Sequence, residues 1–167
     1  SWVRGHWKRY KTVIRKTNET IGVATRIMAD IWKRGFAEGL EKGASPFDEA
    51  IENFNKFIAM QPNHSKAHFG LGNAMMMKGH LDLAMHEYRL SAQLDPTFAF
   101  PYMNMANIQM QTKNIPAAIE NFEKALMIMP GIPAVHLSLG MIYYQFQNDI
   151  PKALGYLREA LRLNPHQ

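Results

Sequence analysis

The sequence has no cysteine, and this absence excludes several kinds of chemistry. A chain without thiols cannot form disulfides, use a thiolate nucleophile, or hold zinc or an iron–sulfur cluster through cysteine. A glycine-rich phosphate-binding loop is also missing, and no nucleophile can be paired with a base. The seven histidines are scattered; His64 and His68 are four residues apart, but no third ligand or flanking Glu completes a metal site. The sequence therefore predicts a protein that is not an enzyme and holds no metal or cofactor.

Positive charge is scarce outside the N-terminal part of the chain. The whole sequence carries a net charge of +5. Residues 1–34 hold nine Lys and Arg against two Asp and Glu, a net +7, whereas the remaining 133 residues hold ten against twelve, a net −2. The basic character therefore belongs to one segment, which is where an acidic partner would be expected to bind.

The sequence contains no uninterrupted hydrophobic run long enough to predict a transmembrane helix. The longest uncharged stretch, residues 125–148, has the length of a membrane span, but Pro130, Gly131 and Pro133 interrupt it in the middle. A secretory signal is not visible either. Because the chain opens at Ser1 without an initiator methionine, the sequence leaves open whether a targeting or anchoring segment has been removed, and the compartment stays undetermined.

Four prolines recur at a nearly constant interval. Pro62, Pro96, Pro130 and Pro165 are separated by 34, 34 and 35 residues. In step with them, an alanine in each unit is followed four residues later by an aromatic residue or leucine. These pairs are Ala50 and Phe54, Ala84 and Tyr88, Ala118 and Phe122, and Ala153 and Leu157. A fixed period of this length indicates a stacked helical repeat.

The residues at the repeat positions resemble those of the tetratricopeptide repeat (TPR) family, whose loose pattern is a bulky residue, Leu-Gly, an aromatic residue, Ala, Phe, Ala and a closing Pro. The second unit has His68, Leu71-Gly72, Met75, Ala84, Tyr88, Ser91 and Pro96. The third has Tyr102, Met105-Ala106, Gln109, Ala118, Phe122, Ala125 and Pro130. The fourth has His136, Leu139-Gly140, Tyr143, Ala153, Leu157, Ala160 and Pro165. The first unit is degenerate, with Trp32, Gly35-Phe36, Gly39, Ala50, Phe54, Phe57 and Pro62.

The resemblance implies an all-α fold, a right-handed superhelical solenoid of antiparallel helix pairs with an N-terminal extension helix. The expected domains are a basic, aromatic-rich segment with an amphipathic helix, residues 1–28, and a TPR domain, residues 29–167, with repeats at 29–62 (degenerate), 63–96, 97–130 and 131–165. The paired helices are expected at 29–43, 46–60, 64–78, 81–94, 98–112, 115–128, 132–147 and 150–163.

Each unit is expected to place small residues where its two helices cross too closely for a larger side chain. Ala84 and Ala118 lie at such positions, so Leu or Phe there would overpack the crossing at a cost of roughly 1–3 kcal/mol. His68 and His136 occupy the bulky repeat position, where a packed structural role is expected. Four methionines at or beside repeat-core positions are also expected to be buried: Met75, Met85, Met105 and Met127.

The resemblance also implies a binding surface, because the first helix of each TPR unit lines the concave groove in which partners bind. Two of these helices, within residues 97–112 and 132–147, contain no charged residue. An apolar, uncharged surface is rarely left without a partner, and methionine adapts well to irregular apolar partners. We therefore expect the groove to bind an apolar or amphipathic protein segment. The predicted groove residues are Phe69, Asn73, Met76, Met77, Phe100, Met103, Asn104, Asn107, Met110, Leu137, Met141 and Tyr144.

Some TPR proteins hold a C-terminal carboxylate in a clamp of Lys, Arg and Asn on these helices. Asn73 and Asn104 fall at the matching Asn positions, but uncharged residues occupy the cationic positions, so a carboxylate clamp is not expected. Those residues are Phe69, Phe100, Ala134 and Ser138. The alternatives for Asn73, Asn104 and Asn107 are hydrogen bonds to the backbone of a bound peptide or ordinary solvation.

Three interpretations of the basic N-terminal segment remain open. It caps the solenoid with its charges in solvent, it anchors the chain to an anionic membrane surface through residues 1–34, or it binds nucleic acid. Nucleic acid is the least expected, because the repeats supply no basic stripe. The candidate anchor residues are Trp2, Arg4, Trp7, Lys8, Arg9, Tyr10, Lys11 and Arg15.

The sequence as a whole predicts a non-catalytic protein–protein interaction scaffold that works as a subunit of a larger assembly, which could be membrane-associated. The alternative is a peripheral membrane or nucleic-acid adaptor that acts through its basic N-terminal helix. The last unit is expected to present an apolar outer face that needs a cover, either from a continuation of the natural protein or from another subunit. We expect the second, a homo-oligomer being one such arrangement. The candidates for that face are Ile142, Phe146, Leu154 and Leu161.

Overall fold

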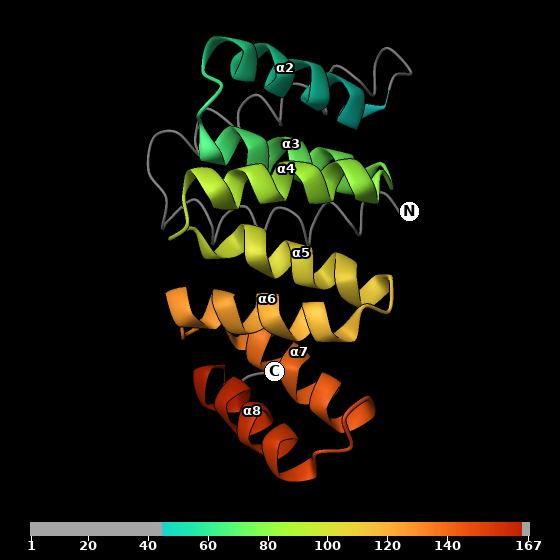
Figure 1. Cartoon of the computed structure of the whole chain (residues 1–167), viewed down its shortest axis with the longest axis vertical. Coiled ribbons are helices and arrows are strands. Elements are labelled where there is room, and N and C mark those ends of the chain that lie inside the picture. Colours follow the sequence, from blue (N-terminus) through green and yellow to red (C-terminus); the bar gives the residue numbers. More distant parts are fainter. Residues whose placement is uncertain (1–44, 165–167) are drawn as a thin grey trace. The chain divides into compact units, whose positions relative to one another are not determined.

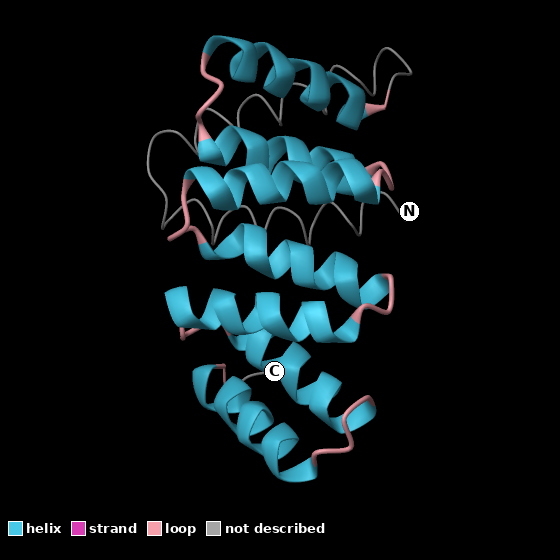
Figure 2. Ribbon diagram, in the orientation of Figure 1, coloured by secondary structure: helices cyan, strands magenta, loops and turns pink. Residues whose placement is uncertain are grey.

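Every regular element of the computed structural model is an α-helix within residues 45–164, the part of the chain that the structure describes (Figure 1). The helices are α2 (Pro46–Met60), α3 (Ser65–Met77), α4 (Leu81–Leu94), α5 (Ala99–Gln111), α6 (Ile115–Ile128), α7 (Pro133–Gln145) and α8 (Ile150–Leu163). Short loops connect them (Figure 2). These helices agree with the expected ranges to within two residues at either end, and the all-α prediction is confirmed. The segment 1–28, its candidate anchor residues and the helix expected at 29–43 lie outside the described residues.

The chain forms two compact units, and the boundary between them lies between Pro62 and Asn63. Helix α2 belongs to the first unit. Ser45 caps its first turn, because the serine side-chain oxygen accepts a hydrogen bond from the Phe47 amide at 3.4 Å. Pro46 follows in the first turn, where the amide hydrogen that proline lacks would have no partner inside the helix. The Ser-Pro dipeptide therefore sets the start of α2.

The second unit, Asn63–Gln167, contains three antiparallel helix pairs that follow one another in chain order (Figure 1). α3 packs on α4, α5 on α6 and α7 on α8, and successive pairs meet where α4 contacts α5 and where α6 contacts α7. The turn inside each pair holds a residue with a positive φ: Gly79 at 82°, Lys113 at 60° and Asn148 at 51°. Glycine and asparagine adopt this conformation readily, whereas lysine does so with strain.

Small residues lie where the two helices of a pair cross. Ala84, Ala118 and Ala153 have exposed fractions of 0%, 0% and 1%. A Cβ atom added to Gly72 would lie 2.7 Å from Cε1 of Tyr88, much closer than the usual 3.5–4.0 Å or so between nonbonded carbon atoms. The prediction that the helices of these pairs approach too closely for larger side chains is therefore confirmed.

Two clusters of buried side chains hold consecutive pairs together. The first contains Ala84, Met85, Tyr88, Ala92, Met105 and Ile108. The second contains Ala106, Ile115, Ala118, Phe122, Val135, Leu139, Ile142, Tyr143 and Ala153. Both clusters join the second helix of one pair to the first helix of the next, and the second cluster also includes Ala106 of α5 and Ala153 of α8. Stacking therefore buries apolar faces that a single pair would leave in water.

The expectation that four methionines are buried is wrong at one position. Met85 and Met105 are buried and Met75 is partly buried, but Met127 has an exposed fraction of 84%. Met127 follows the buried Ala125 by two residues, which is about 200° around a helix. Its side chain therefore lies on the side of α6 opposite the buried cluster.

The expected outer face of the last pair is confirmed for three residues and wrong for one. Phe146, Leu154 and Leu161 are exposed, whereas Ile142 is fully buried. Ile142 follows Leu139 by three residues on α7, and both belong to the cluster that α7 forms with α6. Ile142 therefore faces the preceding pair instead of the outer surface.

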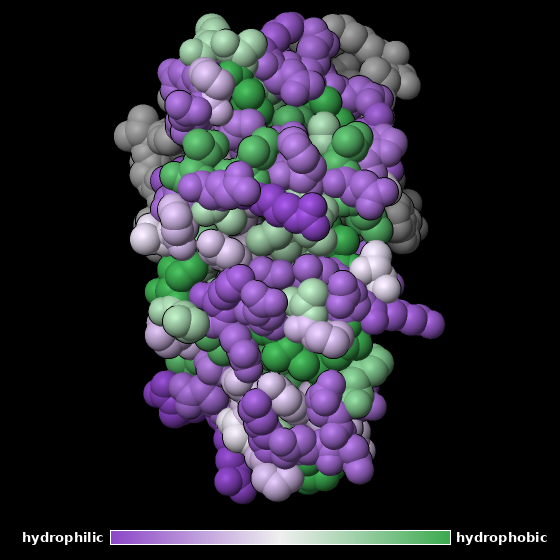
Figure 3. Space-filling view, viewed as in Figure 1, coloured by the Kyte–Doolittle hydropathy of each residue, from purple (hydrophilic) through white to green (hydrophobic). Residues whose placement is uncertain are grey.

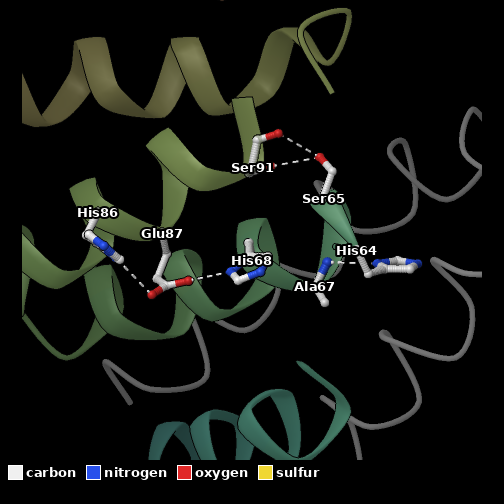
Figure 4. Close-up of polar contacts among 7 residues, drawn as sticks. All are labelled: His64, Ser65, Ala67, His68, His86, Glu87 and Ser91. Carbon is white, nitrogen blue, oxygen red and sulfur yellow. Dashed lines mark hydrogen bonds and ion pairs between the residues drawn. The ribbon is translucent and has the colours of Figure 1, made fainter. Parts of the chain in front are cut away.

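Polar contacts hold α3 against α4 (Figure 4). Nδ1 of His68 lies 2.7 Å from Oε2 of Glu87, and both side chains are largely buried. The Ser65 hydroxyl donates a hydrogen bond to the carbonyl oxygen of Ser91 at 2.9 Å. These contacts satisfy polar groups that would otherwise be buried without partners.

His136, the other histidine at the bulky repeat position, is also packed. Its Nε2–H donates to the carbonyl oxygen of Pro130 at 2.8 Å, and its ring lies 6.0 Å from that of Tyr156. The predicted structural role of His68 and His136 is therefore confirmed.

Candidate partner-binding surface

The predicted groove residues lie on the first helices of the three pairs, and aromatic rings connect two of these helices. The ring centroids of Phe69 on α3 and Phe100 on α5 are 6.3 Å apart. Phe98, the N-terminal cap of α5, lies 5.0 Å from Phe69 and 5.7 Å from Phe100. The three rings form one partly buried cluster. The sequence pattern missed Phe98, because this residue precedes α5 and does not take part in its helical periodicity.

Asn73 and Asn104 meet between α3 and α5. The Asn104 side-chain amide donates to the Asn73 side-chain oxygen at 2.9 Å, and the Tyr88 hydroxyl donates to the same oxygen at 2.7 Å. Because a carbonyl oxygen has two lone pairs, that oxygen is fully used. The Asn73 amide hydrogens and the Asn104 oxygen have no partner among residues 45–164. One donor group and one acceptor therefore remain available next to each other.

The predicted groove methionines of α3 and α5 are only partly accessible. Met76 packs against the α4–α5 cluster, and its sulfur lies 3.6 Å from the Tyr88 hydroxyl oxygen. Met103 and Met110 pack against the α6–α7 cluster. Met77 and Asn107, the remaining predicted residues of these two helices, are also partly buried. Several groove candidates therefore support the core while keeping part of their surface exposed.

Helix α7 carries the most exposed part of the predicted surface. Leu137, Met141 and Tyr144 have exposed fractions of 40%, 43% and 59%. Their spacing of four and three residues places them on one face of the helix, and α7 contains no charged residue. In the space-filling view, hydrophobic side chains reach the surface between α6 and the last pair (Figure 3). These three residues, called the α7 stripe below, form an apolar surface in contact with water.

Charged groups next to α7 are paired with tyrosine on its other side. The Lys152 ammonium donates to the Tyr143 hydroxyl oxygen at 2.7 Å, and this hydrogen bond raises the pKa of Lys152. The Tyr143 hydroxyl in turn donates to Glu123 at 3.3 Å. Tyr156 stacks on Tyr143 at 5.6 Å, and burial raises the pKa of the Tyr156 hydroxyl. These groups satisfy one another through Tyr143, which is not part of the α7 stripe.

Residues 45–164 offer neither a metal site nor a membrane-spanning helix. Within residues 45–164, no group of three His, Asp or Glu side chains is arranged to hold a metal ion. None of the helices there is long and apolar enough to cross a membrane. The described surface offers apolar side chains, amide groups and aromatic rings, a combination that suits a protein ligand.

Comparisons with known proteins agree with this architecture. Two family models, both described as tetratricopeptide repeat, match residues 43–97 and 101–131. The chain is 29% identical over 109 residues to the protein CTR9 homolog of Arabidopsis thaliana, an alignment that covers 62% of this chain and 10% of that protein. It is 25% identical over 115 residues to the anaphase-promoting complex subunit CDC16 of Saccharomyces cerevisiae, covering 69% of this chain and 14% of that protein. The chain thus spans a small part of either relative.

A solved structure gives the same result for the fold. The crystal structure of MamA matches with a TM-score of 0.68 and 24% sequence identity, covering 93% of this chain and 85% of that chain. TPR helix pairs form a scaffold for protein–protein interactions, and the stacked pairs, the small residues at their crossings and the two family matches agree with one another. The chain belongs to the tetratricopeptide repeat family and folds as an all-α TPR solenoid.

Proposed function

We propose that this TPR protein is a non-catalytic interaction scaffold that binds an apolar or amphipathic protein segment along α3, α5 and α7. The observation that carries the proposal is the α7 stripe, which is apolar, uncharged and exposed. Exposed apolar patches are uncommon on proteins that work alone. Removing such surface from water stabilises a complex by about 25 cal/mol per Å² before the costs of association.

Asn73 and Asn104 add a second, polar element to the proposed surface. Their available amide hydrogens and oxygen match the C=O and N–H groups of a peptide backbone. Recognition through backbone groups is tolerant of the partner's sequence, whereas apolar contacts select side chains by shape. The proposal therefore combines backbone hydrogen bonds at α3 and α5 with apolar burial at α7.

Similarity to a subunit of a known complex supports a role for this chain in a multi-subunit assembly. The yeast relative is named as a subunit of the anaphase-promoting complex. We infer that this chain likewise works as a subunit of a larger complex, without assigning it to the complex of that relative. Partner binding on such a scaffold requires no catalytic residue.

The charge of residues 1–34 supports a second role, attachment to an anionic membrane surface. Their net charge is +7, and each Lys or Arg near anionic lipid contributes about 1 kcal/mol. Co-sedimentation of the intact chain with vesicles containing phosphatidylserine tests this role. Changing Arg4, Lys8, Arg9 and Lys11 to Gln, or raising the salt concentration, is expected to weaken binding. Tight binding to RNA together with none to vesicles would replace this role with nucleic-acid binding.

The groove is tested with peptides selected from a displayed library on the intact chain. We expect the selected peptides to be rich in apolar residues. Leu137→Glu combined with Met141→Glu is expected to weaken their binding at least about tenfold, because the complex would bury unpaired carboxylates. Met127→Glu is the matched control, since Met127 is highly exposed on α6. Equal loss of binding in the control, or no loss in the double variant, would refute the proposal.

A further inference from the structure

Methionine is the only sulfur-containing residue of the chain, which has twelve methionines and no cysteine. Because no thiol is present, mild oxidants act on methionine. A peroxide converts the apolar thioether of methionine to a polar sulfoxide, and thiol-dependent reductases reverse the change. The way in which the fold exposes its methionines therefore determines where the protein responds to oxidants.

Three methionines are exposed among residues 45–164. Met60, Met127 and Met141 have exposed fractions of 74%, 84% and 43%. Met85 and Met105 are buried in the cluster between α4 and α5, and the other methionines of this part of the chain are partly buried. A dissolved peroxide reaches an exposed thioether before a buried one, so these three are expected to react first.

Met141 differs from the other two exposed methionines in its position. It is the middle residue of the α7 stripe, four residues after Leu137 and three before Tyr144. Met127 lies on the side of α6 opposite the buried cluster, and Met60 is the last residue of α2 in the first compact unit. Of the three, only Met141 therefore changes the proposed partner surface when it is oxidised.

The repeat already accepts a polar side chain at the position of Met141. Asn107 of α5 and Asn73 of α3 precede Met141 by 34 and 68 residues and occupy the equivalent position. Both asparagines are partly buried within regular helices. A sulfoxide resembles a side-chain amide in that it is polar and its oxygen accepts hydrogen bonds. Oxidation of Met141 is therefore expected to leave α7 folded.

The same change is unfavourable when a partner covers the α7 stripe. A sulfoxide oxygen in the free protein is hydrogen-bonded to water, because the Met141 side chain is exposed. In the complex it would lose this water, and apolar side chains of the partner offer no donor in exchange. The hydroxyl of Ser138, three residues before Met141, already donates to the carbonyl oxygen of Ala134 at 3.0 Å. The oxidised residue is therefore tolerated in the free protein and disfavoured in the complex.

We propose that oxidation of Met141 by hydrogen peroxide prevents partner binding at the α7 stripe, and that reduction of the sulfoxide restores it. The proposal rests on the proposed function, because it concerns regulation of the same surface. It gives the exposed methionine of the stripe a role that leucine at the same position would not supply.

The chemical step transfers one oxygen atom. The thioether sulfur attacks a peroxide oxygen, an S–O bond forms as the O–O bond breaks, and the displaced hydroxide takes up the remaining proton and leaves as water. The sulfur is oxidised by two electrons, and the peroxide is reduced by two. In the reverse direction two thiols are oxidised to a disulfide, and the sulfoxide oxygen leaves as water.

The probe is a library-selected peptide without methionine, titrated against the intact protein by fluorescence anisotropy. Protein treated with dilute hydrogen peroxide, and then with catalase to remove the peroxide, is compared with untreated protein. Mass spectrometry measures oxidation at each methionine, and circular dichroism measures helix content. We expect unchanged helix content, oxidation of Met141, and binding weakened at least about tenfold. Treatment with both methionine sulfoxide reductases and a thiol is expected to restore binding.

Two variants assign the effect to one sulfur atom, and each is compared with its own untreated sample. Met141→Leu has no sulfur at the centre of the stripe, so peroxide is expected to weaken its binding less than about twofold. Met127→Leu is the matched control, because it removes a more exposed sulfur outside the stripe. Peroxide is expected to weaken its binding at least about tenfold, as in the wild type.

Several results would overturn the proposal. They are equal loss of binding in Met141→Leu, loss of helix content on treatment, full binding by protein whose Met141 is oxidised, and failure of the reductases to restore binding. If Leu137→Glu with Met141→Glu does not weaken binding of the untreated protein, the proposed function fails together with this inference. If that double variant loses binding but oxidation of Met141 has no effect, the α7 stripe binds its partner and only the regulation is wrong.

Discussion

The middle and last helix pairs carry the same apolar pattern in opposite surroundings. Ile115 and Phe122 of α6 are buried, whereas the equivalent Ile150 of α8 is exposed and the equivalent Leu157 is only partly buried. The residues alone do not produce this difference, because both helices place apolar side chains at the same positions. It arises because α7, the first helix of the next pair, packs on α6, whereas among residues 45–164 no helix of a further pair follows to pack on the corresponding face of α8. A repeat therefore specifies a contact surface whether or not the next helix is present.

The largest expected effect comes from truncating the same repeat position in the two pairs. Phe122→Ala is expected to cost about 3–5 kcal/mol, because the side chain is fully buried in the cluster that contains residues of α5, α6 and α7. Leu157→Ala is expected to cost about 2 kcal/mol or less, since the neighbouring space is partly open to water. Urea unfolding monitored by circular dichroism measures both. Equal costs would mean that the two pairs are packed alike.

Glycine substitutions are expected to have opposite signs at the first and last pairs. Gly72→Ala is expected to destabilise by about 1–3 kcal/mol, because Tyr88 is fully buried, holds a hydrogen bond to Asn73 and cannot easily move. Gly155→Ala is expected to stabilise by about 0.5–1 kcal/mol, because the site is open and alanine favours the helix. Thermal unfolding of the two variants, compared with the wild type, shows whether each substitution raises or lowers the stability. A stabilising Gly72→Ala would contradict the close crossing.

A reciprocal exchange compares the turns of the middle and last pairs. Lys113→Asn is expected to stabilise by about 0.5–1 kcal/mol, because asparagine tolerates the positive φ that lysine adopts with strain. Asn148→Lys is expected to destabilise by a similar amount, since it introduces the same strain into the α7–α8 turn. Denaturation midpoints with the wild type as reference measure both changes. If both exchanges destabilise, side-chain contacts and not backbone conformation determine the preference.

The smallest expected effect concerns two exposed ion pairs. Hydrogen bonds from Lys124 and Arg162 lower the pKa of Glu120 and of Glu159 below the ordinary value of 4.5. Each carboxylate therefore contributes stability that is present above pH 4.5 and is lost as the pH falls through the lowered pKa. Glu120→Gln and Glu159→Gln are expected to lower the melting temperature slightly at pH 7 and not at pH 2. A larger loss at pH 2 than at pH 7 would contradict the direction of the shifts.

The positions of the helices could be predicted from the sequence because their ends are marked locally. Proline and the 34-residue period determine where each helix begins and ends, and the alanines that recur four residues before a bulky residue identify the crossings. The burial of Ala84, Ala118 and His136 follows from this pattern. Rotation of a helix about its axis is harder to predict, and the sequence pattern places Met127 and Ile142 on the wrong faces.

The candidate surface could be predicted only in outline. The absence of charge identified α5 and α7, but the degree of exposure depends on how neighbouring pairs pack. Met103 therefore supports the core, whereas Met141 is exposed. The hydrogen bonds that join Asn73 to Asn104 link residues 31 positions apart, and Phe98 meets Phe69 across a loop. Contacts of this kind can be predicted only when the three-dimensional arrangement of the helix pairs is known.

The most direct test of the proposed scaffold surface uses methionine as a natural probe. Met141 lies on the α7 stripe and Met127 on the far side of α6, and both are exposed enough to react with dilute hydrogen peroxide. Mass spectrometry measures the rate of sulfoxide formation at each residue with and without a library-selected peptide. We expect the peptide to slow oxidation of Met141 several-fold and to leave Met127 unchanged. Equal protection of both residues, or none at Met141 when the peptide is bound, would contradict partner binding along α3, α5 and α7.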